Sequence, residues 1–174
     1  MKILILNGSP RKGNTVTAIN AFVEGAKDKH EIEVVDTYKL NVSPCIACKA
    51  CQLENGCFAK DDSTMIADKA VAADMIVFAT PVYWTGITAQ LKLVMDKMYC
   101  REKLLGGKKV GTIVVGGDEV EGEQYHLIER QFAGIADFIK WEMVFNKAYC
   151  AYDKDDLANN VSALEDLKAE GSKL

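Results

Sequence analysis

Short apolar runs alternate with amphipathic helical segments along the whole chain. Five runs have the length and the flanking turn residues of buried strands, and they cover residues 2–6, 31–36, 74–80, 110–115 and 141–149. Because parallel strands are joined by long crossovers that usually contain a helix, this order predicts a mostly parallel sheet covered on both faces. We therefore expect the chain, residues 1–174, to form one doubly wound α/β domain.

The segments between these runs repeat apolar residues at helical spacing. We expect the first helix to follow the loop at 7–15, with Asn14 or Thr15 as its N-terminal cap. A single final helix is expected to carry the apolar residues that recur between 157 and 167.

Composition excludes several other classes of protein. The 174 residues are 49% hydrophobic and 26% charged, which is too apolar for a disordered chain. No apolar stretch approaches the roughly 20 residues that cross a bilayer, and the run at 3–6 is too short for a secretory signal. We therefore expect a cytoplasmic protein without a membrane partner, and we interpret the terminal Ser172-Lys173-Leu174 as a chance match to a peroxisomal signal. The net charge of −4 and the absence of a dense basic face argue against nucleic acid as a partner.

The loop that leaves the first strand has the character of an anion site. In an open parallel sheet the ligand lies beyond the carboxyl ends of the strands, which here points to residues 7–15, 81–88 and 116–124. In the first of these loops, backbone donors and the start of a helix can bind an anion, and Ser9 and Arg11 add side-chain donors.

Two common phosphate loops are absent from this position. Asn14 stands where a Walker loop needs lysine, and the GxGxxG spacing of dinucleotide-binding folds does not occur. A monophosphate bound without a metal fits better, and the alternative is a surface turn that is rich in small residues.

Four cysteines are crowded into one segment, at Cys45, Cys48, Cys51 and Cys57. In a reducing compartment such thiols favour metal or redox use over disulfides. Thiolates are soft ligands and four of them suffice for a [4Fe–4S] cluster, whereas zinc sites more often use two separated CxxC pairs. A cluster is the leading interpretation, and zinc and metal-free thiols remain open. The other two cysteines, Cys100 and Cys150, are expected to be small buried hydrophobic residues.

Three segments follow the first three expected strands: GSPRKGNT after the first strand, C-x2-C-x2-C-x5-C after the second and PVYWTGITAQLKLVMDK after the third. Together they resemble the iron–sulfur flavoproteins, which belong to the flavodoxin-like NAD(P)H-dependent FMN reductases. The resemblance covers nearly the whole chain. It implies a three-layer, five-stranded parallel sheet with the strand order 2-1-3-4-5 and a cysteine-rich insertion at about 42–62.

The same resemblance implies a noncovalently bound FMN, reduced by NAD(P)H or by a protein donor. It implies that the FMN phosphate is held by Ser9, Arg11, Lys12, Gly13, Asn14 and Thr15. It implies that the ribityl chain and ring are followed by Pro81, Val82, Tyr83, Trp84, Thr85 and Gly86, and that the ring is approached by Gly116 and Gly117. It also implies a homodimer or a dimer of dimers, with the flavin near the subunit interface.

Physical arguments support two of these assignments. Glycines at the end of a strand let the backbone approach a flat ligand that a Cβ atom would obstruct, as Gly116 and Gly117 could. Tyr83 and Trp84 offer planar apolar surface for a ring system, and packing or a dimer contact is the alternative for them.

We therefore expect an FMN-dependent oxidoreductase that passes electrons to a small-molecule or protein acceptor, with a cluster as a further carrier. In such an enzyme the flavin carries the chemistry, so no catalytic triad is expected, and His30 and His126 are interpreted as surface residues. Two other classes remain open. One is a flavodoxin-like electron carrier without small-molecule turnover, and the other is a cysteine-based redox sensor.

Overall fold

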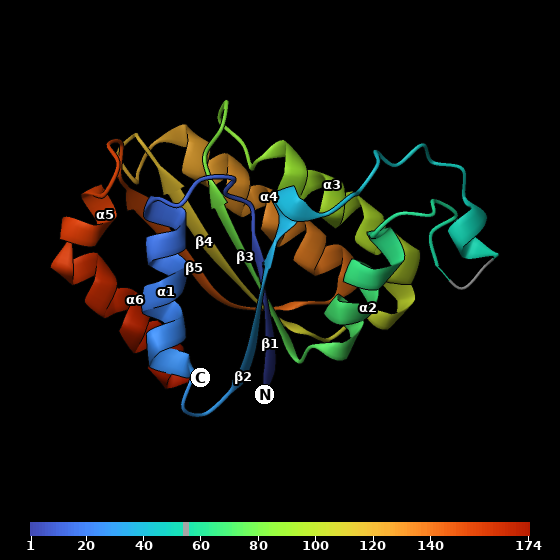
Figure 1. Ribbon diagram of the computed structural model, residues 1–174, viewed down its shortest axis with the longest axis horizontal. Coiled ribbons are helices and arrows are strands. Elements are labelled where there is room, and N and C mark those ends of the chain that lie inside the picture. Colours follow the sequence, from blue (N-terminus) through green and yellow to red (C-terminus); the bar gives the residue numbers. More distant parts are fainter. Residues whose placement is uncertain (54–55) are drawn as a thin grey trace.

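Five parallel strands form one sheet in the order β2-β1-β3-β4-β5, as predicted (Figure 1). The computed structural model describes residues 1–53 and 56–174. The strands are β1 (Lys2–Asn7), β2 (Glu31–Asp36), β3 (Met75–Pro81), β4 (Lys109–Gly116) and β5 (Glu142–Cys150). Each lies within two residues of its expected bounds.

Helices cover both faces of this sheet. One face carries α1 (Asn14–Ala26), α5 (Asp156–Asn159) and α6 (Val161–Lys173). The other face carries α2 (Ser63–Ala72), α3 (Ala89–Met98) and α4 (Glu123–Ile139) (Figure 1). The described residues also form three short 3₁₀ turns, η1 (Thr37–Lys39), η2 (Ala50–Gln52) and η3 (Tyr99–Leu104).

The central strands are buried on both faces, so their side chains divide between two cores. Ile3 and Ile5 of β1 pack toward α1 and α6, whereas Leu4 and Leu6 pack toward α2, α3 and α4. This division follows from the alternation of side chains along a strand. On the second face, the Phe78 ring lies 5.0 Å from that of Phe132 and 5.7 Å from that of Trp141, measured between centroids.

Two expectations about the helices were wrong. The residue that caps α1 is Gly13, without a side-chain cap, because the Asn14 side chain is bonded elsewhere. The expected final helix is two helices that meet at Asn160, whose side chain accepts a hydrogen bond from the Ala163 backbone N–H at 3.1 Å. That bond caps α6 and starts a new helix within the segment expected to be continuous.

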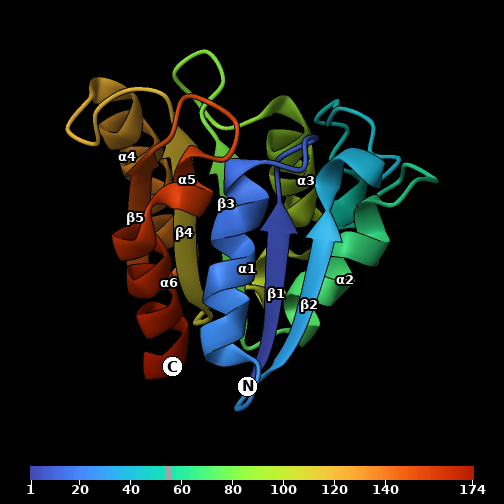
Figure 2. The ribbon, with the colours of Figure 1, turned by 60° about the vertical axis from the view of Figure 1, so that its left-hand side comes forward.

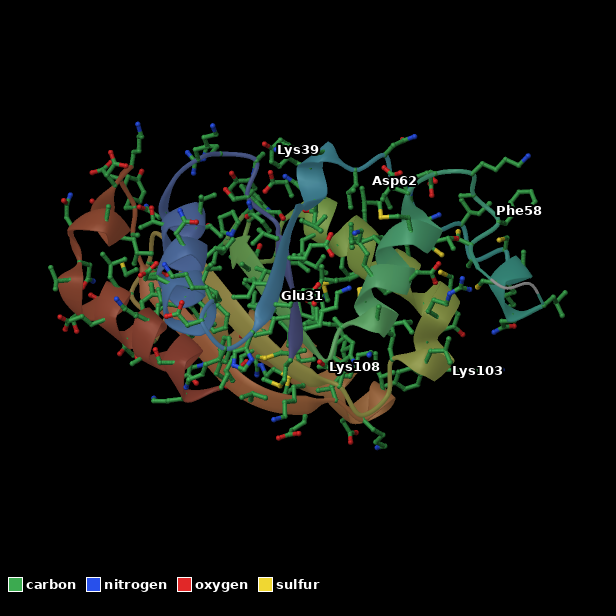
Figure 3. All side chains as sticks on the ribbon, turned by 60° about the horizontal axis from the view of Figure 1, so that its bottom comes forward. Glu31, Lys39, Phe58, Asp62, Lys103 and Lys108 are labelled. Atoms are coloured by element: carbon green, nitrogen blue, oxygen red, sulfur yellow. The ribbon has the colours of Figure 1, made fainter. Side chains whose placement is uncertain are left out.

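All five strands run in the same direction, so their carboxyl ends meet at one edge of the sheet. Figure 2 shows the loops that follow β1, β3, β4 and β5 gathered above this edge. The cysteine-rich segment extends sideways from the same end, between β2 and α2 (Figures 1 and 3). Among the described residues, no helix combines the length and the apolar character that a membrane span requires.

Candidate functional site

A cavity of about 320 Å³ lies at the carboxyl edge of the sheet, where the loops after β1, β3, β4 and β5 meet. Most of the predicted cofactor-binding residues line it: Ser9, Arg11, Lys12, Gly13, Asn14, Thr15, Pro81, Val82, Tyr83, Gly116 and Gly117. Trp84, Thr85 and Gly86 do not line the cavity, although they belong to the same loop as Tyr83. The structure thus brings three separately predicted segments to one place.

The first loop is held in shape by its own hydrogen bonds. The Asn7 side chain accepts the Ser9 N–H at 2.9 Å, and the Ser9 hydroxyl donates to the Arg11 carbonyl at 2.9 Å. The Gly8 N–H donates to the Ala79 carbonyl of β3 at 2.7 Å, which joins the loop to the neighbouring strand. Because no side chain caps the N-terminus of α1, its first backbone N–H groups remain available to a ligand.

The charges around this cavity favour an anion. Arg11, Lys12 and Lys154 line it, and its lining includes no Asp or Glu among the residues that the structure describes. The positive end of the α1 dipole adds to this potential. The site combines backbone donors, two loops that carry cations and a helix N-terminus.

The loop after β3 makes a tight turn beside the cavity. Tyr83 and Gly86 exchange two backbone hydrogen bonds, Tyr83 N–H to Gly86 O at 2.9 Å and Gly86 N–H to Tyr83 O at 3.1 Å. Between them, Trp84 and Thr85 have left-handed backbone conformations, with φ of 49° and 62°. Trp84 is 99% exposed, so none of the described residues packs against its ring. A large apolar side chain in a costly backbone conformation points to a contact with another molecule.

The glycine at the end of β4 is required by the packing of the protein itself. A Cβ atom at Gly116 would lie 2.7 Å from the Tyr125 hydroxyl oxygen and 2.9 Å from Cγ2 of Val82. The Tyr125 hydroxyl lies 3.0 Å from the Asp118 carbonyl oxygen and 3.1 Å from that of Tyr149. Burial raises the pKa of Tyr125 to about 12, so this phenol stays protonated and ties β5 to the loop after β4.

Sequence reasoning missed one wall of the cavity. Ala151, Tyr152 and Lys154, from the loop after β5, line it together with the first loop. The signal was present in the predicted fold, because a fifth parallel strand ends at the same edge as the other four.

The cysteine segment surrounds a second cavity of about 480 Å³. Cys45, Cys48, Cys51 and Cys57 all line it, and so does Cys100, which η3 supplies. Lys97 of α3 is 5% exposed, and its Nζ donates to the Cys57 sulfur at 3.4 Å. The cysteine segment therefore lies against α3 and η3, next to a buried cation.

The four predicted ligands supply the right donor chemistry but are not arranged as a metal site. Within residues 1–53 and 56–174, no three His, Cys, Asp or Glu side chains are grouped closely enough to hold a metal ion. Cys45 and Cys48 are exposed, and Ala47 and Lys49 have left-handed backbone conformations, with φ of 52° and 61°. For a single metal ion, the thiols would have to come closer together. Residues 54–55 of the insertion lie outside the described part of the chain.

The exposure of the other two cysteines and of the two histidines agrees only in part with the expectation from sequence. Cys100 is half-buried, and burial raises the pKa of its thiol. Cys150 is exposed, so the expectation of a buried residue was wrong: it ends β5, where the strand leaves the core. His126 is on the surface, as expected, whereas His30 is half-buried, with Nδ1 3.2 Å from the amino-terminal nitrogen.

Comparison with known proteins gives a consistent result. The family model described as NADPH-dependent FMN reductase matches residues 1–155. The chain is 36% identical over 138 residues to an iron–sulfur flavoprotein of Methanocaldococcus jannaschii, covering 72% of this chain and 70% of that protein. It is 39% identical over 129 residues to an iron–sulfur flavoprotein of Methanosarcina thermophila, covering 71% and 68%. Among solved structures, an azoreductase from Bacillus anthracis matches the full length of both chains with a TM-score of 0.76. At 16% identity, that likeness concerns the fold alone.

Proposed function

Because the chain belongs to the NADPH-dependent FMN reductase family, we propose that the cavity at the carboxyl edge of its sheet binds FMN for electron transfer from a nicotinamide donor. The observation that carries this proposal is the composition of the cavity wall. Three cations, an uncapped helix N-terminus and no carboxylate meet there among the described residues. Such a wall suits the phosphate of FMN, which is held without a metal.

The residues divide between two ends of the ligand. The phosphate end consists of Ser9, Arg11, Lys12, Gly13, Asn14 and Thr15, the last two through their backbone N–H groups at the start of α1. The ribityl and ring end consists of Pro81, Val82, Tyr83, Trp84, Thr85, Gly86, Gly116 and Gly117. Trp84 stands outside the cavity on the same turn, where its exposed ring can contact the substrate or the flavin edge.

The protein's share of the reaction is binding and orientation. FMN, when bound, accepts a hydride and gives up electrons one or two at a time. The first loop binds the phosphate, and the turn at Tyr83–Gly86 places Tyr83 on the cavity wall. No acid or base is assigned to the described cavity wall, in which Tyr83 and Tyr152 are the only phenols.

The decisive experiment is a flavin titration followed by turnover. FMN added to apoprotein should lose its fluorescence with one site per chain, and NADPH oxidation should then continue when a quinone or free flavin is supplied. Arg11→Met should weaken FMN binding about tenfold, because it removes a charge-assisted contact with the phosphate. Arg130→Met, at an exposed arginine of α4, is the matched control. Failure of the wild-type protein to bind FMN would overturn the proposal, and FMN binding without NAD(P)H oxidation would favour an electron carrier.

We propose further that the cysteine segment takes up an iron–sulfur cluster after rearrangement. Support comes from four thiols on the wall of one cavity and from the likeness to two iron–sulfur flavoproteins. Protein purified without oxygen should contain iron and sulfide, and the Cys57→Ser variant should lose both while still binding FMN. Two results for the protein purified without oxygen would contradict the proposed cluster. One is zinc in place of iron, and the other is the absence of any metal together with thiols that all react with a thiol reagent.

We also propose that the chain forms a homodimer. Support comes from a groove of about 520 Å³ whose wall includes Tyr99, Phe138 and Trp141 from η3, α4 and the segment before β5. Phe138 and Tyr99 are exposed in the isolated chain. Light scattering should give twice the mass of the chain, and Phe138→Asp should shift it to the monomer.

A further inference from the structure

The Asn14 side chain holds the loop between β5 and α5 against the first loop. Its Nδ2 donates to the Asp153 carbonyl at 2.8 Å and lies 3.4 Å from the Ala151 carbonyl. Its Oδ1 accepts the Leu157 backbone N–H at 3.2 Å. Both polar atoms of this amide are therefore engaged with a segment more than 130 residues away, so the side chain has little capacity left for a ligand.

Two further contacts fix the same loop. The Ala151 N–H donates to the Gly116 carbonyl at 2.7 Å, which continues the sheet by one bond beyond β5. The Asp156 carboxylate accepts the Asp153 N–H at 2.7 Å. The first contact joins the loop to the end of β4, and the second joins it to the start of α5.

The side chains that this loop carries suit a flavin nucleotide. Tyr152 lies over Gly117, where a Cβ atom would come within 2.6 Å of its Cδ2. Its side chain is 82% exposed yet lines the cavity, which is the position of a ring with one face on the protein and the other toward a ligand. Lys154 lines the same cavity as Arg11 and Lys12, whereas Asp153 and Asp155 of the same loop are not part of the described lining.

We propose that the loop 151–155 forms a fourth wall of the flavin site, in which Lys154 binds the phosphate and Tyr152 packs on the apolar part of the ligand. In this arrangement Asn14 is a positioning residue that holds the loop in place. The inference rests on the proposed FMN site and adds a specificity element to it. Because Lys154 acts on the phosphate alone, it should contribute to the preference for FMN over riboflavin.

The test compares the affinities of FMN and riboflavin, measured by quenching of flavin fluorescence in apoprotein. Lys154→Met should weaken FMN binding about tenfold and leave riboflavin unchanged, as expected for loss of one charge-assisted phosphate contact. Tyr152→Leu should weaken both ligands by a similar factor of about five, because it removes aromatic contact without touching the phosphate. Lys168→Met, at an exposed lysine of α6, is the control and should change neither affinity.

Asn14→Ala provides a readout that does not depend on the flavin. Hydrogen exchange of the Leu157 amide should become faster in the apoprotein, and both ligands should bind more weakly. Equal affinities for wild type, Lys154→Met and Tyr152→Leu would overturn the inference while leaving the FMN site intact. A wild-type protein that binds neither ligand would instead overturn the proposed function. The Lys154 and Tyr152 variants change exposed side chains, so they remain informative even if Asn14→Ala fails to fold.

Discussion

The Asp61 carboxylate holds Ser43 by two hydrogen bonds: its Oδ2 accepts the backbone N–H at 2.9 Å and the hydroxyl at 2.5 Å. Its Oδ1 accepts the Ser63 backbone N–H at 2.9 Å. Burial alone would raise the pKa of Asp61, but the hydrogen bonds from Ser43 and Ser63 outweigh it and hold the pKa well below its ordinary value of 3.8. The Asp61 carboxylate therefore joins the beginning of the cysteine segment, at Ser43, to its end, next to Ser63.

Asp61→Asn should loosen this segment without unfolding the sheet. An amide turned to accept from Ser63 presents its NH₂ to the Ser43 backbone N–H, so the bond from this N–H is lost, whereas the Ser43 hydroxyl can still accept from the amide. The Ser43 amide should exchange about tenfold faster, while amides of β3 stay unchanged. Asp137→Asn, at an exposed carboxylate of α4, is the control. Unchanged exchange at Ser43 would contradict the assignment.

The same carboxylate makes the segment sensitive to acid. A carboxyl group whose pKa is lowered on folding stabilises the folded form fully above its unfolded pKa, and this contribution is lost as the pH falls through the folded pKa. Protection of the Ser43 amide should therefore be constant from pH 7 to 5 and decline below about pH 4. In Asp61→Asn the decline should be absent, which hydrogen exchange at several pH values can check.

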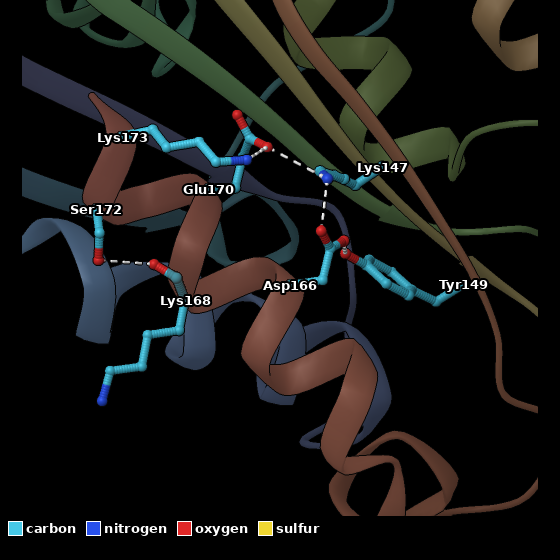
Figure 4. Close-up of polar contacts among 7 residues, drawn as sticks. All are labelled: Lys147, Tyr149, Asp166, Lys168, Glu170, Ser172 and Lys173. Atoms are coloured by element: carbon cyan, nitrogen blue, oxygen red, sulfur yellow. Dashed lines mark hydrogen bonds and ion pairs between the residues drawn. The ribbon is translucent and has the colours of Figure 1, made fainter.

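A hydrogen bond between β5 and α6 predicts a loss of stability in alkali. The Tyr149 hydroxyl donates to Asp166 Oδ2 at 2.7 Å, and Lys147 bridges Asp166 and Glu170 at 2.8 and 3.2 Å (Figure 4). Burial of the phenol and the bond to the Asp166 carboxylate raise the pKa of Tyr149 above its ordinary value of 10.0. As the pH rises through 10, the unfolded chain releases this proton while the folded chain keeps it, so stability falls.

Tyr149→Phe isolates this effect. At pH 7 the variant should be less stable by about 1 kcal/mol, because it loses the hydrogen bond to Asp166. Between pH 9 and pH 10.5 the difference from the wild type should shrink, since phenylalanine does not ionise. Urea unfolding at these pH values measures both quantities, and a difference that is independent of pH would contradict the assignment.

Gly116→Ala should destabilise the fold by about 1–3 kcal/mol, the usual range for overpacking. The added methyl group meets the Tyr125 hydroxyl oxygen at 2.7 Å and cannot be accommodated without moving the tie between β5 and the loop after β4. Gly134→Ala is the matched control, because nothing lies within 4 Å of its added methyl group. In α4 that change should be neutral or stabilising by up to about 1 kcal/mol. Thermal and urea unfolding of the two variants would separate the cost of overpacking from the general effect of replacing glycine by alanine.

Trp84→Asn should separate function from stability at the turn after β3. Asparagine tolerates the left-handed backbone better than tryptophan, and the exposed ring packs against none of the residues that the structure describes, so stability should stay equal or rise by up to about 1 kcal/mol. The rate of NADPH oxidation should fall about two- to tenfold, as expected for the loss of one aromatic contact. A variant with full turnover would show that Trp84 contacts neither substrate nor flavin.

Much of the fold followed from sequence because the strands are short, apolar and well separated. Runs such as Met75–Pro81 are buried on both faces, and this environment requires a continuous apolar sequence that is visible without a structure. The final helix was mispredicted because its apolar spacing continues across Asn160, whereas the bond from this side chain to the Ala163 N–H starts a separate helix.

The sequence by itself determined the order of strands and helices along the chain and the chemistry of the first loop, since both depend on neighbouring residues. Only the tertiary structure decided which distant segments complete the two sites. Asn14 meets Asp153 across 139 positions, and Lys97 meets Cys57 across 40. Such contacts depend on how helices and loops pack around the sheet, so the spacing of residues along the chain does not predict them.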